Sequence, residues 1–323
     1  MDTTTIDDVQ IRHAEPFRAF LQRRGRRYDK KSRNRRGDAI KRLWVLPSRL
    51  YKYAEELGLP SVDAIIEQNT LFPCLSRFLG DADQGALIRH HLFDPVDMIS
   101  QIVGLTASLA PTLNWAPGIC LDCQSEDMRT YGHTIWRRDF LLPEVRWCGR
   151  HNAPIFHLCD ACLRRFATGT HFDVPLSRCP CGQPLALRAK TIHRQEREVA
   201  LGWQRLLDSA FAPYIGSREM AALINNRAAE LRLIDDKQIS WVRCLDFFGS
   251  QRLRGFSNSI GFRLAGKPLQ NALLGKKCPR HPIHAILLLV ALYGSWHAVE
   301  ELLLDRSACL EELDDEMFAE EDL

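Results

Sequence analysis

Two consecutive sets of cysteine and histidine residues constrain this chain more than any other feature of its sequence. The first set is Cys120, Cys123, Cys148 and His151, and the second is Cys159, Cys162, Cys179 and Cys181. In each set a close pair, a spacer and a second close pair follow one another, as in segments that surround a zinc ion tetrahedrally. The spacing predicts two structural zinc sites, whose ions add folding free energy to a segment with little core of its own.

Other roles for these cysteines are less favoured. Free cysteines in a core are one alternative, since free Cys is a common buried residue. Disulfides are a weaker one, because the N-terminus has no signal-peptide pattern and we expect a reducing compartment, the cytoplasm. Both sets are complete, whereas a catalytic zinc keeps one position open for water, so we expect no hydrolysis. The remaining cysteines are interpreted as ordinary core or surface residues: Cys74, Cys244, Cys278 and Cys309.

The rest of the chain is predicted to be helical. Residues 50–57 carry apolar side chains at helical spacing, Gly58 ends that helix, and a second helix follows Ser61. This order of helix, short turn and helix is typical of a helix-turn-helix and equally of two core helices in a small bundle. Further helices are expected at 195–211, 218–231, 240–248 and 283–304. The last begins with the longest apolar run, about half of what a bilayer needs, so we expect no contact with a membrane.

These patterns predict a mainly α fold with small zinc-ribbon or knuckle modules. We divide the chain into a basic N-terminal arm (1–42), a helical HTH-like domain (43–115), a tandem zinc-binding module (116–190), a helical C-terminal domain (191–310) and an acidic tail (311–323). The arm also contains one short apolar patch, at Phe17, Phe20 and Leu21.

Charge is distributed unevenly along the chain, although the formal net charge is only +3. Between Arg23 and Arg42 the basic residues are opposed by only two aspartates, and residues 311–323 contain acidic residues without any base. Blocks of this kind are usually solvated, but a basic arm is also the electrostatic footprint of phosphate contact.

Seven arginines are candidates for nucleic-acid contact. Three lie in the arm and four inside the loop that the first set would enclose: Arg33, Arg35, Arg36, Arg137, Arg138, Arg146 and Arg150. A zinc knuckle would hold the latter four with little ordering cost, although a solvated surface is an equal interpretation. Trp136 and Trp147 alternate with them and are expected in the core rather than stacked on bases.

Two catalytic classes are disfavoured by the residues themselves. Gly261 to Lys267 matches most of a phosphate-binding loop, but Pro268 stands where Ser or Thr must hold magnesium. Any ATP dependence would then belong to a partner. A nuclease of the HNH type would need His133 or His157 as its catalytic base, and Asn152 stands on the wrong side of that motif.

The metal-binding region is similar to a known family in the order of its motifs. Cys120-Leu-Asp-Cys123 is followed by Tyr131-Gly-His-Thr-Ile-Trp-Arg-Arg138, Leu142-Pro-Glu-Val145, Cys148-Gly-Arg-His151, Cys159-Asp-Ala-Cys162 and Cys179-Pro-Cys-Gly182. The flanking segments Leu46-Pro-Ser-Arg-Leu50, Asn69-Thr-Leu-Phe-Pro73 and His281-Pro-Ile-His284 fit as well. Together they resemble the TniQ/TnsD family of transposon target-selection proteins over roughly residues 43–305. The family's usual opening helix, an acidic residue followed by Ser-Leu-x-x-Trp, is replaced here by the basic arm.

The resemblance implies a protein that is not an enzyme and that marks where a mobile element inserts. Members of the family bind target DNA directly or bind an RNA-guided CRISPR effector complex. They then recruit an AAA+ ATPase, which brings the transposase. For this chain we therefore expect two Zn²⁺ ions, DNA and the ATPase as partners, and indirect contact with the transposase, with a homodimer left open. The alternative is a free-standing zinc-dependent DNA- or RNA-binding regulator.

Overall fold

The computed structural model describes residues 11–23, 44–59, 61–108, 116–167, 178–189, 192–208, 211, 216–235 and 238–305. The acidic tail and nearly all of the basic run, including Arg33, Arg35 and Arg36, lie outside these residues. In the described part helices dominate, and the strands form three two-stranded antiparallel pairs. The prediction of a mainly α fold with small strand pairs is confirmed.

A small helical core forms at the N-terminal end. Helices α1 (Phe17–Arg23), α3 (Leu50–Leu57) and α4 (Val62–Asn69) share a cluster of apolar side chains. Helix α3 ends at Gly58, and the Ser61 hydroxyl accepts a hydrogen bond from the Ala64 amide at 3.2 Å, capping α4 as the sequence predicts. The two helices predicted around Gly58 are therefore present and pack together with α1.

Part of the expected arm belongs to this bundle. Residues 11–23 are described, and Phe17 and Phe20 of α1 are fully buried. The Asn69 side-chain amide donates to the carbonyls of Arg12 and Glu15 at 2.8 and 2.9 Å, which fixes the segment before α1. The segment 1–42 is therefore not one solvated arm, because its apolar patch packs against α3 and α4.

Three further helices complete the N-terminal part: α5 (Phe72–Ser76), α6 (Asp81–Leu92) and α7 (Ile99–Ile102). Two buried histidines near the end of α6 hold the extended segment before α3. His90 bonds the Leu46 carbonyl at 3.1 Å, and His91 bonds the Pro47 carbonyl at 2.7 Å. Burial lowers the pKa of His91 to about 3, so its ring is neutral at physiological pH.

The middle segment contains most of the strands. Its elements are α8 (Leu121–Tyr131), the 3-10 turn η3 (Arg138–Phe140), β1 (Trp147–Cys148), β2 (Ala153–Pro154), β3 (Phe156–His157), α9 (Asp160–Ala167) and β4 (Ala186–Leu187). Strand β1 pairs with β2, and β3 pairs with β4. Reciprocal backbone bonds between Ile119 and Phe156, at 2.8 and 2.9 Å, join the start of α8 to the second strand pair.

The C-terminal part is helical except for one hairpin. It comprises α10 (Arg194–Leu207), α11 (Ser217–Glu230), β5 (Ile234–Asp235), β6 (Gln238–Ile239), α12 (Trp241–Phe247), α13 (Gln251–Ser259), α14 (Lys267–Leu273) and α15 (Pro282–Tyr293). The helix expected at 283–304 is broken at Gly294, which has a φ of +88°. Among the described residues no single helix is long and apolar enough to cross a membrane. The helix pair Pro282–Tyr293 and Trp296–Asp305, bent by 95°, passes such a test only together.

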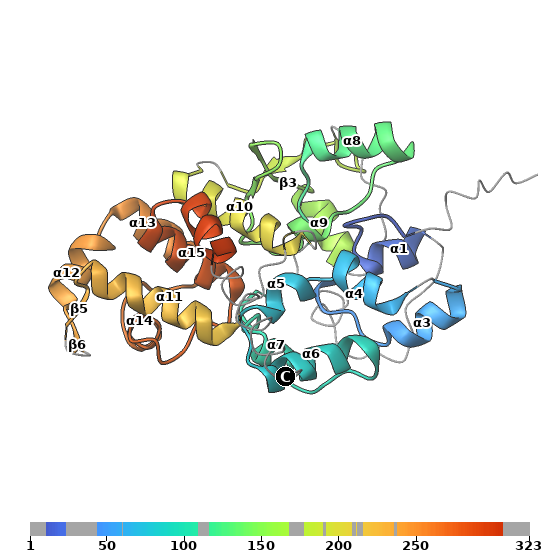
Figure 1. Ribbon diagram of the computed structural model, residues 1–323. Helices are drawn as coiled ribbons and strands as arrows, with labels where there is room; N and C mark the ends of the chain where they lie inside the picture. Colours follow the sequence, from blue (N-terminus) through green and yellow to red (C-terminus); the bar gives the residue numbers. More distant parts are fainter. Residues whose placement is uncertain are drawn as a thin grey trace, which may run out of the picture.

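Helix α10 connects the three parts of the molecule (Figure 1). It contacts α5 of the N-terminal part, β1 of the middle segment and α15 of the C-terminal part. One cluster of buried apolar side chains runs from Trp44 through Trp147 to Leu303. In the described part of the chain, residues from all three predicted domains therefore contribute to this cluster.

Candidate metal centres

The first predicted set comes together at the start of α8 and the turn of a hairpin. Cys120 immediately precedes α8 and Cys123 lies in its first turn, while Cys148 ends β1 and His151 lies in the turn that leads to β2. All four donor atoms lie within 4.8 Å of one another. The Cys120, Cys123 and Cys148 sulfurs are 3.7, 3.3 and 3.6 Å from His151 Nδ1.

These distances fit a tetrahedral metal site. Around a zinc ion with Zn–S near 2.3 Å and Zn–N near 2.0 Å, neighbouring donors are separated by about 3.5–3.8 Å. The Cys123 and Cys148 sulfurs, 3.8 Å apart, lie at this separation, and they are far from the roughly 2.05 Å of a disulfide. The three cysteines are almost fully buried, so the site can hold a metal ion away from solvent.

The hairpin of the first set is packed tightly against α10. A Cβ atom added to Gly149 would lie 2.9 Å from the Leu201 Cα atom, so the backbone of the turn touches the helix. The Arg150 amide also donates to the Gln204 side chain at 3.1 Å. The metal centre is therefore built against the C-terminal part of the protein.

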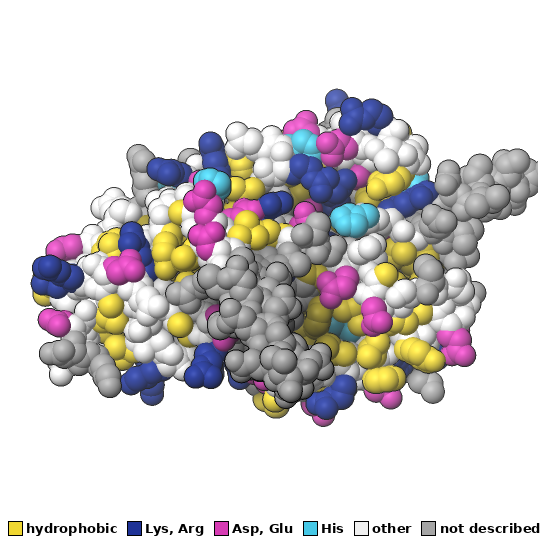
Figure 2. Space-filling view, viewed as in Figure 1, with side chains coloured by type: hydrophobic (Ala, Val, Ile, Leu, Met, Phe, Trp, Pro, Cys, Tyr) yellow, Lys and Arg dark blue, Asp and Glu magenta, His cyan; other side chains and the backbone are white. Residues whose placement is uncertain are grey.

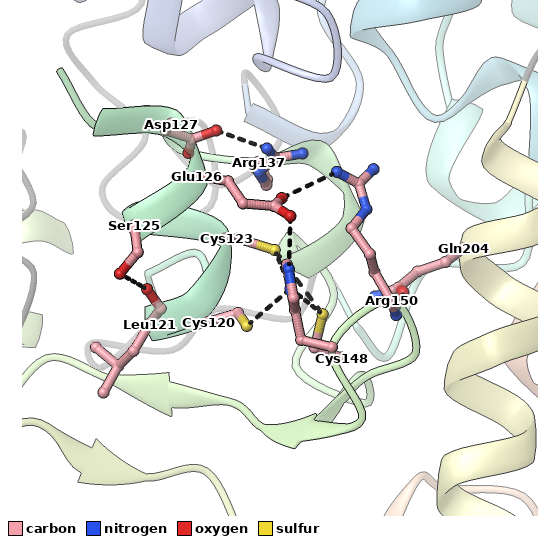
Figure 3. A network of polar contacts seen from close by, with 11 residues as sticks. Cys120, Leu121, Cys123, Ser125, Glu126, Asp127, Arg137, Cys148, Arg150 and Gln204 are labelled. Carbon is pink, nitrogen blue, oxygen red and sulfur yellow. Dashed lines mark hydrogen bonds and ion pairs between the residues drawn. The ribbon is translucent and has the colours of Figure 1, made fainter. Parts of the chain in front are cut away.

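A carboxylate supports the ligand histidine from outside the first set (Figure 3). His151 Nε2 lies 3.0 Å from Glu126 Oε1, which leaves Nδ1 directed at the sulfurs. This hydrogen bond lowers the pKa of Glu126. A carboxylate on the outer nitrogen fixes the tautomer and orientation of a metal-binding histidine. Sequence reasoning missed Glu126, although its position on α8, three residues after Cys123, was a signal.

The second set repeats the first in outline. Cys159 precedes α9 and Cys162 lies in its first turn, while Cys179 and Cys181 lie in a turn closed by the Gly182 amide, which donates to the Cys179 carbonyl at 2.8 Å. The four sulfurs lie within 4.8 Å of one another, with Cys159 3.4 Å from Cys181 and 3.6 Å from Cys179. This set can also hold a metal ion.

The two sets differ in exposure and share their placement at helix starts. Cys162 and Cys179 are buried, but Cys181 is exposed and Cys159 is half-buried. In both sets a Cys-x2-Cys pair begins a helix, where the helix dipole favours thiolates. Several thiolates within such a small volume repel one another, and a cation removes this cost.

The four arginines between the first ligand pairs do not form one surface. Arg137 and Arg138 are both buried, which corrects the expectation that they face solvent. The Arg137 guanidinium lies 2.6 Å from the buried Asp127 carboxylate of α8. Burial opposes the charge of Arg137, but Asp127 nevertheless raises its pKa.

Arg138 joins distant parts of the chain from inside the protein. Its guanidinium donates to the carbonyls of Glu67 and Thr70 at the end of α4, the latter at 2.7 Å, and to the carbonyl of Leu207 at the end of α10. Burial lowers the pKa of Arg138. Arginine caps helix ends in this way because its planar group presents several donors at once. Arg138 is thus a structural clamp.

The other two arginines are placed differently. Arg146 is half-buried and lies 3.7 Å from the buried Glu196 carboxylate. Arg150 is exposed, with its nearest carboxylate, Glu126, at 3.6 Å. Of the four, only Arg150 is on an open surface in the described structure. Trp136 and Trp147 are buried, as the sequence predicts.

A second structural arginine was not predicted from the sequence. The Arg188 guanidinium donates to the carbonyls of Phe140, Leu142, Val145 and Ala116 at 2.9–3.3 Å. It follows β4 and therefore ties the end of the second metal-binding segment to the loops around the first. A single arginine after a short apolar strand gives no local signal of this role.

The residues weighed for other chemistry do not form catalytic constellations. His133 and His157 bond the carbonyls of Tyr131 and Leu158 at 2.9 and 2.7 Å. Gly266 and Lys267 begin the short helix α14 with Pro268 in its first turn, and the loop before them follows helix α13. A phosphate-binding loop instead follows a strand.

Comparison with known proteins gives a partial match. No family model matches the chain. A stretch of 114 residues is 31% identical to the "Transposon Tn7 transposition protein TnsD" of Escherichia coli, and it covers 34% of this chain. The match spans only 22% of that protein's length. Over this part the chain is similar to a TnsD-like transposition protein, in agreement with the resemblance found in the motifs.

Proposed function

We propose that the protein is a non-catalytic zinc-binding adaptor that selects the DNA target site for transposition. The observation that carries the proposal is the 31% identity with a Tn7 transposition protein. It is supported by two complete sets of four converging donors in the same chain. Each set supplies four protein ligands, which leaves no position for a reactive water and suits a structural role.

Zinc is the metal that these donors favour. The first set offers three cysteines and one histidine, and the second offers four cysteines. Soft thiolate ligands in a tetrahedral arrangement select zinc over magnesium, calcium or manganese. Two Zn²⁺ ions per chain would stabilise the middle segment and, through Gly149 and α10, the C-terminal part as well.

Target recognition would involve DNA directly or an RNA-guided CRISPR effector complex. On the face shown in Figure 2, Lys and Arg side chains are spread over the described surface and do not gather in one large basic patch. Contacts with phosphates on this face would then be local. Arg150 is the accessible candidate near the first metal centre, and Arg33, Arg35 and Arg36 remain candidates outside the described residues.

The adaptor would recruit an AAA+ ATPase, which in turn brings the transposase. The test is mass photometry of the purified chain with the ATPase encoded beside it, with and without target DNA, after elemental analysis of its metal content. We expect two zinc ions per chain and a stable complex with the ATPase. If the two proteins do not associate either with or without target DNA, the recruitment role is refuted.

Matched cysteine variants test the metal assignment in the same preparation. Cys120→Ser should lower the zinc content by one ion and destabilise the protein, because metal binding contributes to folding. Cys244→Ser alters a buried cysteine outside both sets and should retain two zinc ions. A folded Cys120→Ser protein with two zinc ions would refute the ligand set.

The alternative function, a free-standing DNA- or RNA-binding regulator, rests on the basic run between Arg23 and Arg42. It predicts nucleic-acid binding with a steep salt dependence and no ATPase partner. Two zinc ions together with salt-dependent DNA binding, and no complex, would favour this alternative.

A further inference from the structure

A basic cavity of about 280 Å³ lies far from the metal ligands in sequence. Its walls come from the start of α6, the start of α11 and the loop between α14 and α15. The start of α11 thus meets the N-terminal helices here (Figure 1). We propose that this cavity binds a backbone phosphate of duplex DNA, an inference that rests on the proposed DNA-binding function.

Four cationic side chains line the cavity: Arg218, Lys276, Lys277 and Arg280. Asp83 is the one carboxylate among the lining residues, and it is 2.9 Å from Arg280. Arg218, Lys276 and Lys277 are exposed and form no ion pair within the described residues. Three unpaired cations around one hollow repel one another, so an anion that enters the cavity is favoured electrostatically.

The loop that carries the two lysines is fixed to the protein. Gly275 has a φ of +65°, and a Cβ atom there would lie 3.1 Å from the Asn225 Cβ atom of α11. The Lys276 and Lys277 amides both donate to the Asn271 carbonyl, at 2.9 and 3.3 Å. Because the backbone is held in this way, binding a phosphate orders side chains and not this loop.

A side-chain hydrogen bond also holds this loop against α11. The Asn225 side-chain amide donates to the Leu273 carbonyl, at the end of α14, at 2.7 Å. The Arg280 guanidinium, farther along the same loop, is oriented by its bond to Asp83 of α6. The loop is therefore held against α11 and α6 before any ligand binds.

Two helices also begin at the cavity. The N-cap residues of α6 and α11, Gly80 and Gly216, form no side-chain cap, so these caps leave first-turn amides without a side-chain acceptor. The positive ends of both helix dipoles add to the field of the lysines and arginines. Asp81 and Asp83 in the first turn of α6, and Glu219 in the first turn of α11, offset part of this field.

The lining favours a phosphodiester over a free nucleotide. Phe78 is the one aromatic residue in the wall, and it is buried in the core, so the cavity presents no surface on which a base could stack. Contacts from lysine and arginine to phosphate position a protein on DNA without reading its sequence. The cavity would thus set how the protein sits on the duplex.

The test compares two double variants of the full-length protein that each lose two positive charges. The Lys276→Gln and Lys277→Gln variant removes both lysines of the cavity. The control, Lys52→Gln with Arg243→Gln, changes two exposed residues that do not line it. Fluorescence anisotropy with a labelled linear duplex gives the binding constant of each protein between about 50 and 200 mM NaCl, where salt dependence is steep.

We expect the cavity variant to bind duplex DNA about ten-fold more weakly. The slope of log K against log salt should fall by about 0.9 for each phosphate that the variant no longer neutralises. The control should keep the wild-type slope. Equal slopes in both variants would overturn the phosphate site while leaving DNA binding intact. A wild-type protein that binds no duplex would overturn the DNA role and, with it, this site.

Discussion

Replacement of Arg138 by methionine should destabilise the protein strongly. The change keeps a side chain of similar length but removes the donors to the carbonyls of Glu67, Thr70 and Leu207. A buried acceptor that loses its donor costs about 1–3 kcal/mol. Three such acceptors lose their donor, but the variant no longer buries the charged guanidinium, and this gain offsets part of the total cost. We expect a decrease of about 3–5 kcal/mol, a large share of the roughly 5–15 kcal/mol that stabilises a typical domain.

Urea-induced unfolding monitored by tryptophan fluorescence measures this decrease, because Trp44, Trp203 and Trp296 are fully buried. Arg138→Lys should fall between wild type and Arg138→Met, since one ammonium group cannot reach three carbonyls as a planar guanidinium does. Arg150→Met, on the exposed surface, should change stability by less than about 0.5 kcal/mol. If Arg138→Met unfolds at the same urea concentration as Arg150→Met, the hydrogen bonds of Arg138 do not stabilise the protein as we propose.

Three other predictions concern the metal centres and pH. Glu126→Gln should weaken metal binding at the first centre by about 10–100-fold and leave the second unchanged, as measured by competition with a fluorescent zinc chelator; equal effects on both centres would contradict the role given to Glu126. Because Cys181 is exposed and Cys120 is buried, a chelator should remove the two ions in two phases, and Cys181→Ser should abolish the faster phase; a single phase in the wild type would count against this difference. His91 stays neutral in the folded protein down to a pKa of about 3, whereas an unfolded histidine binds a proton below 6.5. The stability that His91 contributes is therefore present above pH 6.5 and falls as the pH drops, by up to about 1.4 kcal/mol per pH unit. In His91→Gln, the free energy of unfolding measured in urea should fall less steeply as the pH is lowered. If it falls as steeply as in the wild type, the buried ring does not have the lowered pKa assigned to it.

Local features of the sequence predicted the local features of the structure. The eight cysteine and histidine residues form the two groups that their spacing predicts. The two members of each close pair are only two or three residues apart, so each pair has to meet only the next pair along the chain. The end of α3 at Gly58 and the cap of α4 at Ser61 were equally predictable, since helix signals act within a few residues.

Long-range contacts were not predictable in this way. The sequence led us to expect Arg137 and Arg138 at the surface, yet their partners are Asp127 and carbonyls of α4 and α10. The burial of residues 11–23 likewise depends on an apolar face that α3 and α4 present together. The sequence pattern of one segment does not show which other segments it packs against.

The clamp formed by Arg138 has a consequence for how the protein is made. Its partners at Glu67 and Thr70 precede it by 71 and 68 residues, and its partner at Leu207 follows it by 69. A ribosome that has synthesised both metal-binding sets has not yet released α10, so the clamp is only half complete at that moment. Contacts of such separation close slowly, because the intervening chain must first give up its conformational freedom. Assembly of the common core therefore waits for α10, and a nascent chain that ends before Arg194 still exposes the apolar surface that α10 later covers.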